Sequence, residues 1–578
     1  MFNFSADKKW DREKASLLLI FCCVTLIMLA TRYAGFYTFR GSDDLHYAFL
    51  SSKVLNGNYD MFFAQDIYAG RSVIVLYQAL WFKLFGINNF TMCMPSLSVL
   101  ITLAYVVCFK CGLQKNIRTI ILTGSLIYFN PVVTRTTLGN LPDVYIALIA
   151  LLVFLLIKKS TATLSSKQGI SSGIAAGLLL IAGLFVKETI VLIYAGTAVT
   201  LFYYRKNLSR HFIITLVAIV CAGIAAYLFF YYANTGNAFF RFVQIKNAAF
   251  FNSCSYGCLP GADFLKRLTI TIPLQAVVSS AWPLLLVVPA FAIYRRQKNI
   301  DTGFWKVAFL SLLILALYFP FSIAPYIPLC HDMRQFFFLF PFAAVFFVMG
   351  FGNAELTEKQ TKTINISGSI FFVSATLLCL FLTPYNKWSI LCGGLLAFVF
   401  IVSIFSKRKI QDVGLYLALP FVMWLSTAYT VFKKPHQAYP DLKNMQHKVN
   451  QHAKFYPETY YFLSNDTKTH VALINRFDTA KRFIDLDTIQ KQFKPFIAYQ
   501  PKNLLNGTDS IQKGWLIVSE PYLENMTAVQ IQSIKILLAQ QPYVYKINQT
   551  SAYWIGSGEI LKKIMNIVNQ HDFDSGSY

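Results

Sequence analysis

Charged residues are scarce in this sequence, and carboxylates are the scarcer half of them. Asp, Glu, Lys and Arg make up 14% of the 578 residues, whereas about 25% is usual for a soluble domain. The eleven cysteines show no spacing typical of a zinc site. The first apolar run lacks the small-residue cleavage site of a signal peptide. The low share of charged residues excludes an ordinary soluble protein. The missing cleavage site predicts that the first apolar run is retained as an anchor.

Apolar residues are abundant instead: 56% of the chain is hydrophobic, and Phe alone occurs 53 times. Several runs reach the roughly 20 residues that a helix needs to cross a bilayer. The sequence therefore predicts a polytopic α-helical membrane protein. Thirteen spans are expected, at about 15–33, 92–109, 117–130, 141–157, 170–186, 188–204, 211–233, 273–294, 305–324, 335–351, 365–383, 388–405 and 412–432.

The basic residues alternate between the two sides of these spans. With the N-terminus in the cytoplasm, 22 Lys and Arg fall in seven inner segments, and the four short outer connections carry one each. This asymmetry follows the positive-inside rule and predicts that orientation. Most of the net charge of +25 thus lies beside the membrane, which favours contact with anionic lipid over nucleic acid. An odd number of spans sends residues 436–578 to the outer side.

The acidic residues show the opposite bias. Of nine Asp or Glu between residues 32 and 351, eight fall on the outer side in this topology. Acidic residues have little influence on topology, so this bias is independent of the assignment. It indicates that the polar chemistry of the protein faces outward.

Two regions outside the spans are expected to be structured. In the long outer loop at about 34–91, segments 45–56 and 73–85 have apolar residues at helical spacing and predict helices lying on the membrane surface. The tail alternates strands with helices and predicts a small α/β domain. Its expected strands are Thr459–Ser464, Lys481–Leu486, Trp515–Ser519 and Val544–Asn548, and its expected helices are 441–453 and 526–540. The domains are therefore 1–435 and 436–578.

Five short motifs follow one another in the first 350 residues. They are Asp43-Asp44 after the first span, Arg71 before an aromatic helix ending at Phe85-Gly86, Leu141-Pro142-Asp143, Lys187-Glu188 after a glycine-rich span, and His331-Asp332-Met333-Arg334-Gln335-Phe336. In this order they resemble the GT-C superfamily of membrane glycosyltransferases. The pattern is most similar to the lipid A aminoarabinose transferases and the protein O-mannosyltransferases. The second acid is Asp rather than Glu, and Arg71 stands where many members have Lys, so the sugar and the acceptor stay open.

The resemblance implies a glycosyltransferase at the outer face of a bacterial inner membrane. The donor would be a polyprenyl-phosphate sugar, hexosyl or pentosyl, and the acceptor an envelope glycan, a lipid or a protein. Such a transfer needs a carboxylate base, and Asp43 or Asp44 is the candidate, with Asp43 favoured and Asp44 positioning the acceptor or a metal. Asp143 is the third candidate catalytic residue. The competing explanation for Asp43 and Asp143 is helix N-capping.

The departing phosphate must be stabilised by cations. Arg71 and Lys187 are the first candidates, because they also match family positions, and Arg135 and Arg334 are the second. The competing explanation for each is a basic side chain that snorkels at the end of a span, which is the commoner case for a single basic residue there. Glu188 is expected to pair with Lys187, or to contact the acceptor or a metal. His46, His331 and Asp332 are candidates for a divalent metal or the acceptor, although their spacing is not diagnostic.

Two other functions fit the same composition. A multi-span transporter or flippase of an anionic lipid or sugar would also need many spans and basic outer residues, but the chain shows no internal repeat. An adhesion or assembly subunit would display residues 436–578, where no motif identifies a partner. The long polar first loop favours the enzyme.

Overall fold

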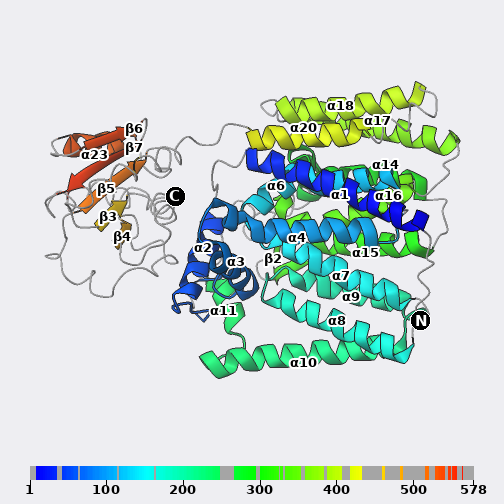
Figure 1. Ribbon diagram of the computed structural model, residues 1–578, viewed down its shortest axis with the longest axis horizontal. Coiled ribbons are helices and arrows are strands. Elements are labelled where there is room, and N and C mark those ends of the chain that lie inside the picture. The colour runs from blue at the N-terminus through cyan, green and yellow to red at the C-terminus, as the bar shows by residue number, and fades with distance from the viewer. Residues whose placement is uncertain are drawn as a thin grey trace.

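The structure is a computed structural model. It describes residues 8–34, 42–62, 66–113, 116–161, 165–247, 266–294, 300–323, 326–329, 332–352, 358–382, 387–405, 417–432, 445, 459–462, 482–485, 514–519, 528–539, 544–547, 550–555 and 563. Every predicted span contains a helix, and most of these helices run side by side (Figure 1). The unbroken ones are α1 (Lys8–Ala34), α4 (Asn89–Lys110), α7 (Asp143–Ser160), α8 (Ser166–Leu184), α9 (Ile190–Tyr204), α10 (Arg210–Thr235), α15 (Ile300–Tyr318), α17 (Glu358–Leu382), α18 (Lys387–Phe405) and α20 (Leu419–Phe432).

The length and apolarity of these helices make the protein an integral membrane protein. Within the described residues, α1, α4, α8 and α10 are each long and apolar enough to cross a bilayer alone. The pair α5 (Ile117–Tyr128) and α6 (Pro131–Leu138) qualifies jointly although it bends by 59°. The bend follows from Pro131, which begins α6 beneath the N-cap Asn130. The total of thirteen spans stays a prediction.

Two predicted spans are irregular. The segment 273–294 is divided into α13 (Ile272–Val278) and α14 (Trp282–Tyr294), a π-helical turn η1 (Arg267–Thr271) precedes it, and Ser280 in the break has a positive φ of 54°. The segment 335–351 begins as a 3-10 helix η2 (Met333–Leu339) before α16 (Phe340–Gly352). Both segments place backbone that is not α-helical among buried side chains, where protein groups replace water as hydrogen-bond partners.

The predicted span 305–324 is too long. Helix α15 ends at Tyr318, and the chain then forms an antiparallel pair of strands, β1 (Pro320–Ile323) and β2 (Tyr326–Pro328). Pro320 explains the early end, because proline has no N–H for the helix and disfavours helical backbone in the residue before it. The apolar composition of 319–324 concealed this hairpin.

The two helices predicted in the first outer loop are confirmed as α2 (Ser42–Leu55) and α3 (Ser72–Phe85). They pack against each other at one end of the layer of helices, close to the short helix α11 (Phe240–Asn247) (Figure 1). Helix α7 lies in the interior, in contact with α4, α8, α16 and η2, and twelve of its residues are buried. The N-terminal end of α7, which carries Asp143, therefore lies within the packed core.

The four strands predicted in the tail are confirmed as β3 (Thr459–Phe462), β4 (Arg482–Asp485), β5 (Gly514–Ser519) and β6 (Val544–Ile547). A fifth strand, β7 (Thr550–Ile555), forms a hairpin with β6, and the sheet order is β4-β3-β5-β7-β6. Strand β3 runs parallel to both neighbours. Helix α23 (Ala528–Leu538) matches the expected helix at 526–540, whereas the expected helix at 441–453 lies outside the described residues except for Met445.

Candidate active site

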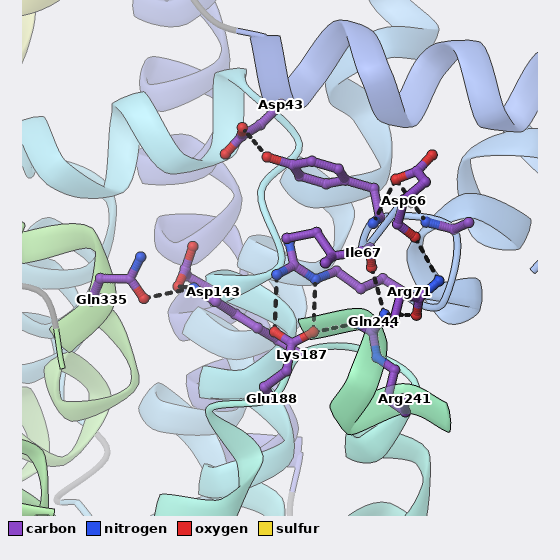
Figure 2. Close-up of polar contacts among 12 residues, drawn as sticks. Asp43, Asp66, Ile67, Arg71, Asp143, Lys187, Glu188, Arg241, Gln244 and Gln335 are labelled. Atoms are coloured by element: carbon purple, nitrogen blue, oxygen red, sulfur yellow. Dashed lines mark hydrogen bonds and ion pairs between the residues drawn. The ribbon is translucent and has the colours of Figure 1, made fainter. Parts of the chain in front are cut away.

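Six segments bring their polar side chains together where α2, α3 and α11 meet the ends of the long helices (Figure 2). They are the first turn of α2, the loop 66–71 before α3, the start of α7, the turn 187–188 between α8 and α9, the start of η2, and α11. Helix α8 ends at Leu184 and α9 begins at Ile190, so Lys187 and Glu188 lie in the turn between them. Arg71 is the residue immediately before α3.

Asp43 accepts two hydrogen bonds. The Tyr68 hydroxyl donates to Oδ1 at 2.7 Å, and Arg334 Nη1 donates to Oδ2 at 3.2 Å (Figure 2 shows the first). Burial alone would raise the pKa of Asp43, but Arg334, the Tyr68 phenol and Arg71 together lower it below its usual value. Burial and the charge of Asp43 raise the pKa of Tyr68, which keeps the phenol a donor. Asp43 is therefore an ionised carboxylate at neutral pH.

Arg71 and Glu188 form a two-point ion pair across 117 residues of sequence. Arg71 Nε lies 3.4 Å from Glu188 Oε1, and Nη2 lies 2.9 Å from Oε2. The remaining nitrogen, Nη1, donates to the Tyr47 hydroxyl at 2.7 Å. Arg241 Nη2 pairs with the same Glu188 carboxylate. Burial would raise the pKa of Glu188, yet the two arginines lower it to about 2.

Lys187 turns away from its sequence neighbour Glu188 and contacts the start of α7. Its Nζ donates to Asp143 Oδ1 at 2.6 Å and to Gln335 Oε1 at 2.8 Å. Burial lowers the pKa of Lys187 against the opposing attraction of Asp143. The expected pair of Lys187 with Glu188 is therefore wrong, because the turn points the two side chains at different partners.

His46 is buried and paired with Asp66. His46 Nε2 lies 2.7 Å from Asp66 Oδ2, and Asp66 Oδ1 accepts from the backbone N–H of Tyr68 at 2.8 Å and of Ala69 at 3.3 Å. One carboxylate thus orients the imidazole and fixes the loop that carries Tyr68. No group of three or more His, Cys, Asp or Glu suited to a metal occurs among the described residues.

The other predicted residues are placed less centrally. Arg135 lies on an exposed face of α6. Asp332 is exposed, caps η2 by accepting from the Arg334 N–H at 3.0 Å, and pairs with the Arg334 Nε at 3.0 Å. Asp44 belongs to α2, but its side chain lies outside the described residues, as does His331.

Sequence reasoning missed five members of this cluster: Tyr47, Asp66, Tyr68, Arg241 and Gln335. Tyrosine hydroxyls and a single amide carry no sequence signal of their own. Arg241 stands among aromatic residues in an outer loop, where a basic residue resembles an ordinary lipid contact. Gln335 adjoins Arg334 within a motif already singled out, and this adjacency was the available signal.

The cations of the cluster differ in accessibility. The side chains of Arg71, Lys187 and Arg241 are at most 10% exposed and are held by carboxylates, whereas that of Arg334 is 38% exposed. Arg334 is also paired with two carboxylates, Asp43 and Asp332, but its side chain is partly open to solvent, where ion pairs are weaker than in the interior. The cluster thus combines an ionised carboxylate, a fixed cationic frame and one accessible arginine.

Solved structures show the same fold. The crystal structure of ArnT from Cupriavidus metallidurans in the apo state matches with a TM-score of 0.58 and 12% identity, covering 95% of this chain and 99% of that one. The same protein bound to undecaprenyl phosphate matches with a TM-score of 0.56 and 11% identity, covering 94% and 99%. No family model and no curated protein sequence matches the chain. The chain therefore shares the fold of ArnT, as the resemblance noted in the sequence predicts.

Proposed function

We propose that this protein is a glycosyltransferase that moves a hexosyl or pentosyl group from a polyprenyl-phosphate donor to an acceptor hydroxyl. The acceptor is an envelope glycan, a lipid or a protein. The site faces the outer side of a bacterial inner membrane, and residues 436–578 lie on that side as a separate α/β domain. The positive-inside charge pattern supports this orientation, and the ArnT structure with undecaprenyl phosphate supports the class of donor.

The observation that carries the proposal is the setting of Asp43. It is an ionised carboxylate beside an accessible arginine, at the edge of a buried cationic frame. In the proposed reaction the acceptor oxygen forms a bond to the anomeric carbon, and the bond from that carbon to the phosphate oxygen breaks. The acceptor proton passes to Asp43, and the electron pair leaves with the polyprenyl phosphate. Asp44, one residue further along α2, is proposed to position the acceptor.

Arg334 gives this reaction an order. Arg334 pairs with Asp43 and lowers the pKa of that carboxylate, which makes Asp43 a weaker base. Before transfer the donor phosphate is a diester with one negative charge. As its bond to the sugar breaks, the leaving phosphate gains a second charge, which attracts the half-exposed Arg334. Asp43 then loses its nearest cation, its pKa rises, and it becomes a stronger base as the leaving group gains its partner. Arg71 and Lys187 hold the phosphate from the buried side.

The test compares Asp43→Asn and the double change Asp43→Asn with Asp44→Asn against Asp60→Asn. Asp60 is an exposed carboxylate of the same loop, and its Oδ1 accepts from the Phe62 N–H at 2.8 Å, which asparagine also does. Cells lacking the protein receive each variant, and mass spectrometry of envelope glycans, lipids and proteins identifies the sugar that depends on it. The Asp43 variants are expected to lose transfer about 10²- to 10⁴-fold.

Two results would reject the assignment. One is a folded Asp43→Asn, Asp44→Asn double variant, present in the membrane at wild-type level, that restores the modification in full. The other is uptake of an anionic lipid or sugar into liposomes without any new glycosidic bond, which would support a transporter. Loss of transfer in Asp60→Asn as well would show that the loop, rather than the carboxylate of Asp43, is sensitive.

A further inference from the structure

Helix α11 places two buried polar side chains against the loop 66–71. Arg241 is 4% exposed, and Gln244 is fully buried one turn later. Arg241 Nη1 donates to the carbonyl of Ile67 at 2.8 Å, and Gln244 Nε2 donates to the carbonyl of Asp66 at 2.8 Å (Figure 2). These backbone carbonyls lie 174 and 178 residues away in sequence. The loop is thus fixed by a distant helix.

The same guanidinium reaches the frame around Arg71. Arg241 pairs through Nη2 with Glu188, the carboxylate that holds Arg71 at two points. One rigid planar group therefore joins the backbone before Tyr68 to the partner of Arg71. A lysine ammonium carries the charge but lacks the planar fork that serves both directions at once.

Gly70 lies against the guanidinium of Arg241 and leaves room for it. A Cβ at this position would lie 2.8 Å from Arg241 Cζ and 3.1 Å from Gln244 Oε1. Real Cβ contacts are essentially never shorter than 3.0 Å. A Cβ at position 70 would therefore displace the guanidinium from its present place, whereas the position has no positive φ that would demand glycine by itself.

We propose that Arg241 is a positioning residue, and that Gln244 and Gly70 complete its seat. Together they form the α11 clamp, which holds the loop 66–71 and Glu188 so that Tyr68 faces Asp43 and Arg71 faces the donor phosphate. The clamp rests on the proposed function only for the identity of that donor. Without Arg241, Glu188 keeps a single cation, and the loop loses one of the two α11 side chains that hold its backbone.

The experiment uses the full-length protein in lipid nanodiscs and two readouts. Hydrogen exchange is measured on a peptide spanning residues 66–71, where the N–H groups of Tyr68 and Ala69 donate to Asp66. Binding of undecaprenyl phosphate is measured in parallel. The variants are Arg241→Ala, the milder Arg241→Lys, Gly70→Ala and the double change Gly70→Ala with Arg241→Ala. Val243→Ala is the control, because Val243 lies on the same helix and is 40% exposed.

Arg241→Ala is expected to raise exchange in this peptide at least tenfold and to weaken undecaprenyl phosphate binding at least tenfold. Gly70→Ala does the same, because its Cβ displaces the guanidinium. The double variant is no worse than Arg241→Ala, since the displaced group is already gone. Arg241→Lys is intermediate, and Val243→Ala matches the wild type.

Three outcomes would overturn the clamp. The first is unchanged exchange at 66–71 in Arg241→Ala. The second is an equal rise in all peptides, which would indicate a general loss of stability. The third is full additivity of Gly70→Ala and Arg241→Ala. If exchange follows the expected pattern but the wild type binds no undecaprenyl phosphate, the clamp stands and the proposed donor is rejected.

Discussion

Two buried arginines, Arg32 and Arg71, show how differently this protein accommodates a guanidinium. Arg32 on α1 is 1% exposed and donates to the Thr137 hydroxyl at 2.8 Å, the Tyr128 carbonyl at 3.2 Å and the Thr134 hydroxyl at 3.4 Å. These partners are all neutral. Arg71 is also buried but is held at two points by the carboxylate of Glu188.

The neutral partners of Arg32 belong to the bend between α5 and α6. The Tyr128 carbonyl ends α5, where the helix dipole leaves partial negative charge that favours a cation. Arg32 therefore stabilises a bend in the fold. Arg71 belongs to a cluster in which carboxylates and cations share partners, and we propose that this cluster binds an anionic donor. The comparison then separates an arginine that supports the fold from one that is proposed to serve the site.

Replacing each arginine by methionine tests this distinction. The larger loss of turnover is expected for Arg71→Met. Arg71→Met removes one cation facing the proposed donor phosphate, and loss of one such group costs about 10²- to 10³-fold in turnover. Glu188 keeps Arg241, so the protein stays folded. Turnover per folded molecule is measured for Arg71→Met and Arg32→Met. Equal losses in the two variants would contradict the comparison.

Lowering the pH is expected to destabilise the region around Arg71 and Glu188 but not the region around Arg32. The pKa of Glu188 is about 2 in the folded protein against an ordinary value of 4.5, so its contribution to stability is present above pH about 4.5 and is lost as pH falls towards 2. That contribution is about 3 kcal/mol, because one pKa unit corresponds to about 1.4 kcal/mol. Unfolding of the wild type and of Glu188→Gln is compared between pH 6 and pH 3. The difference in free energy of unfolding between the two proteins is expected to narrow as the pH falls. A difference that widens instead would contradict the lowered pKa of Glu188.

Arg32→Met is expected to lower the free energy of unfolding by about 1–3 kcal/mol, since the Tyr128 carbonyl loses a buried donor. The loss does not depend on pH between 6 and 3, because the partners of Arg32 do not titrate there. Denaturant unfolding of the detergent-solubilised protein measures it. A strong pH dependence would place Arg32 in an ionic network.

The smallest effect is expected at the bend itself. Asn130 caps α6 by accepting from the N–H of Val132 at 2.9 Å and of Val133 at 3.4 Å. Asn130→Ala should cost about 1 kcal/mol of stability, as is typical for loss of an N-cap, and should leave turnover unchanged. Thermal unfolding together with the transfer assay measures both. A loss of turnover without a loss of stability would link the bend to the site.

The helices could be predicted because apolar runs and helical periods are local properties of sequence. The segments 45–56 and 73–85 were predicted within three residues at either end of α2 and α3. The predicted span 305–324 failed because its composition stays apolar beyond Tyr318, while Pro320 ends the helix. Strand β7 was missed because only its pairing with β5 and β6 distinguishes it from a loop.

The candidate site could be predicted as a set of residue types but not as a set of pairs. Asp43, Arg71, Asp143, Lys187 and Glu188 were all singled out, and the structure brings them together. Their roles in transfer stay predictions. The pairing of Lys187 with Asp143 crosses 44 residues and that of Arg71 with Glu188 crosses 117. Pairs separated by so many residues cannot be recognised from the local spacing of residues in the sequence.

The sequence alone determined that this chain enters a membrane, because burying apolar side chains depends on composition and on the period of the helix. It also determined where carboxylates and cations gather along the chain. The tertiary structure alone decided which charge meets which, and that Arg241 and Gly70 belong to the same site. Electrostatic pairing depends on distance in space, and the packing of helices far apart in sequence sets that distance.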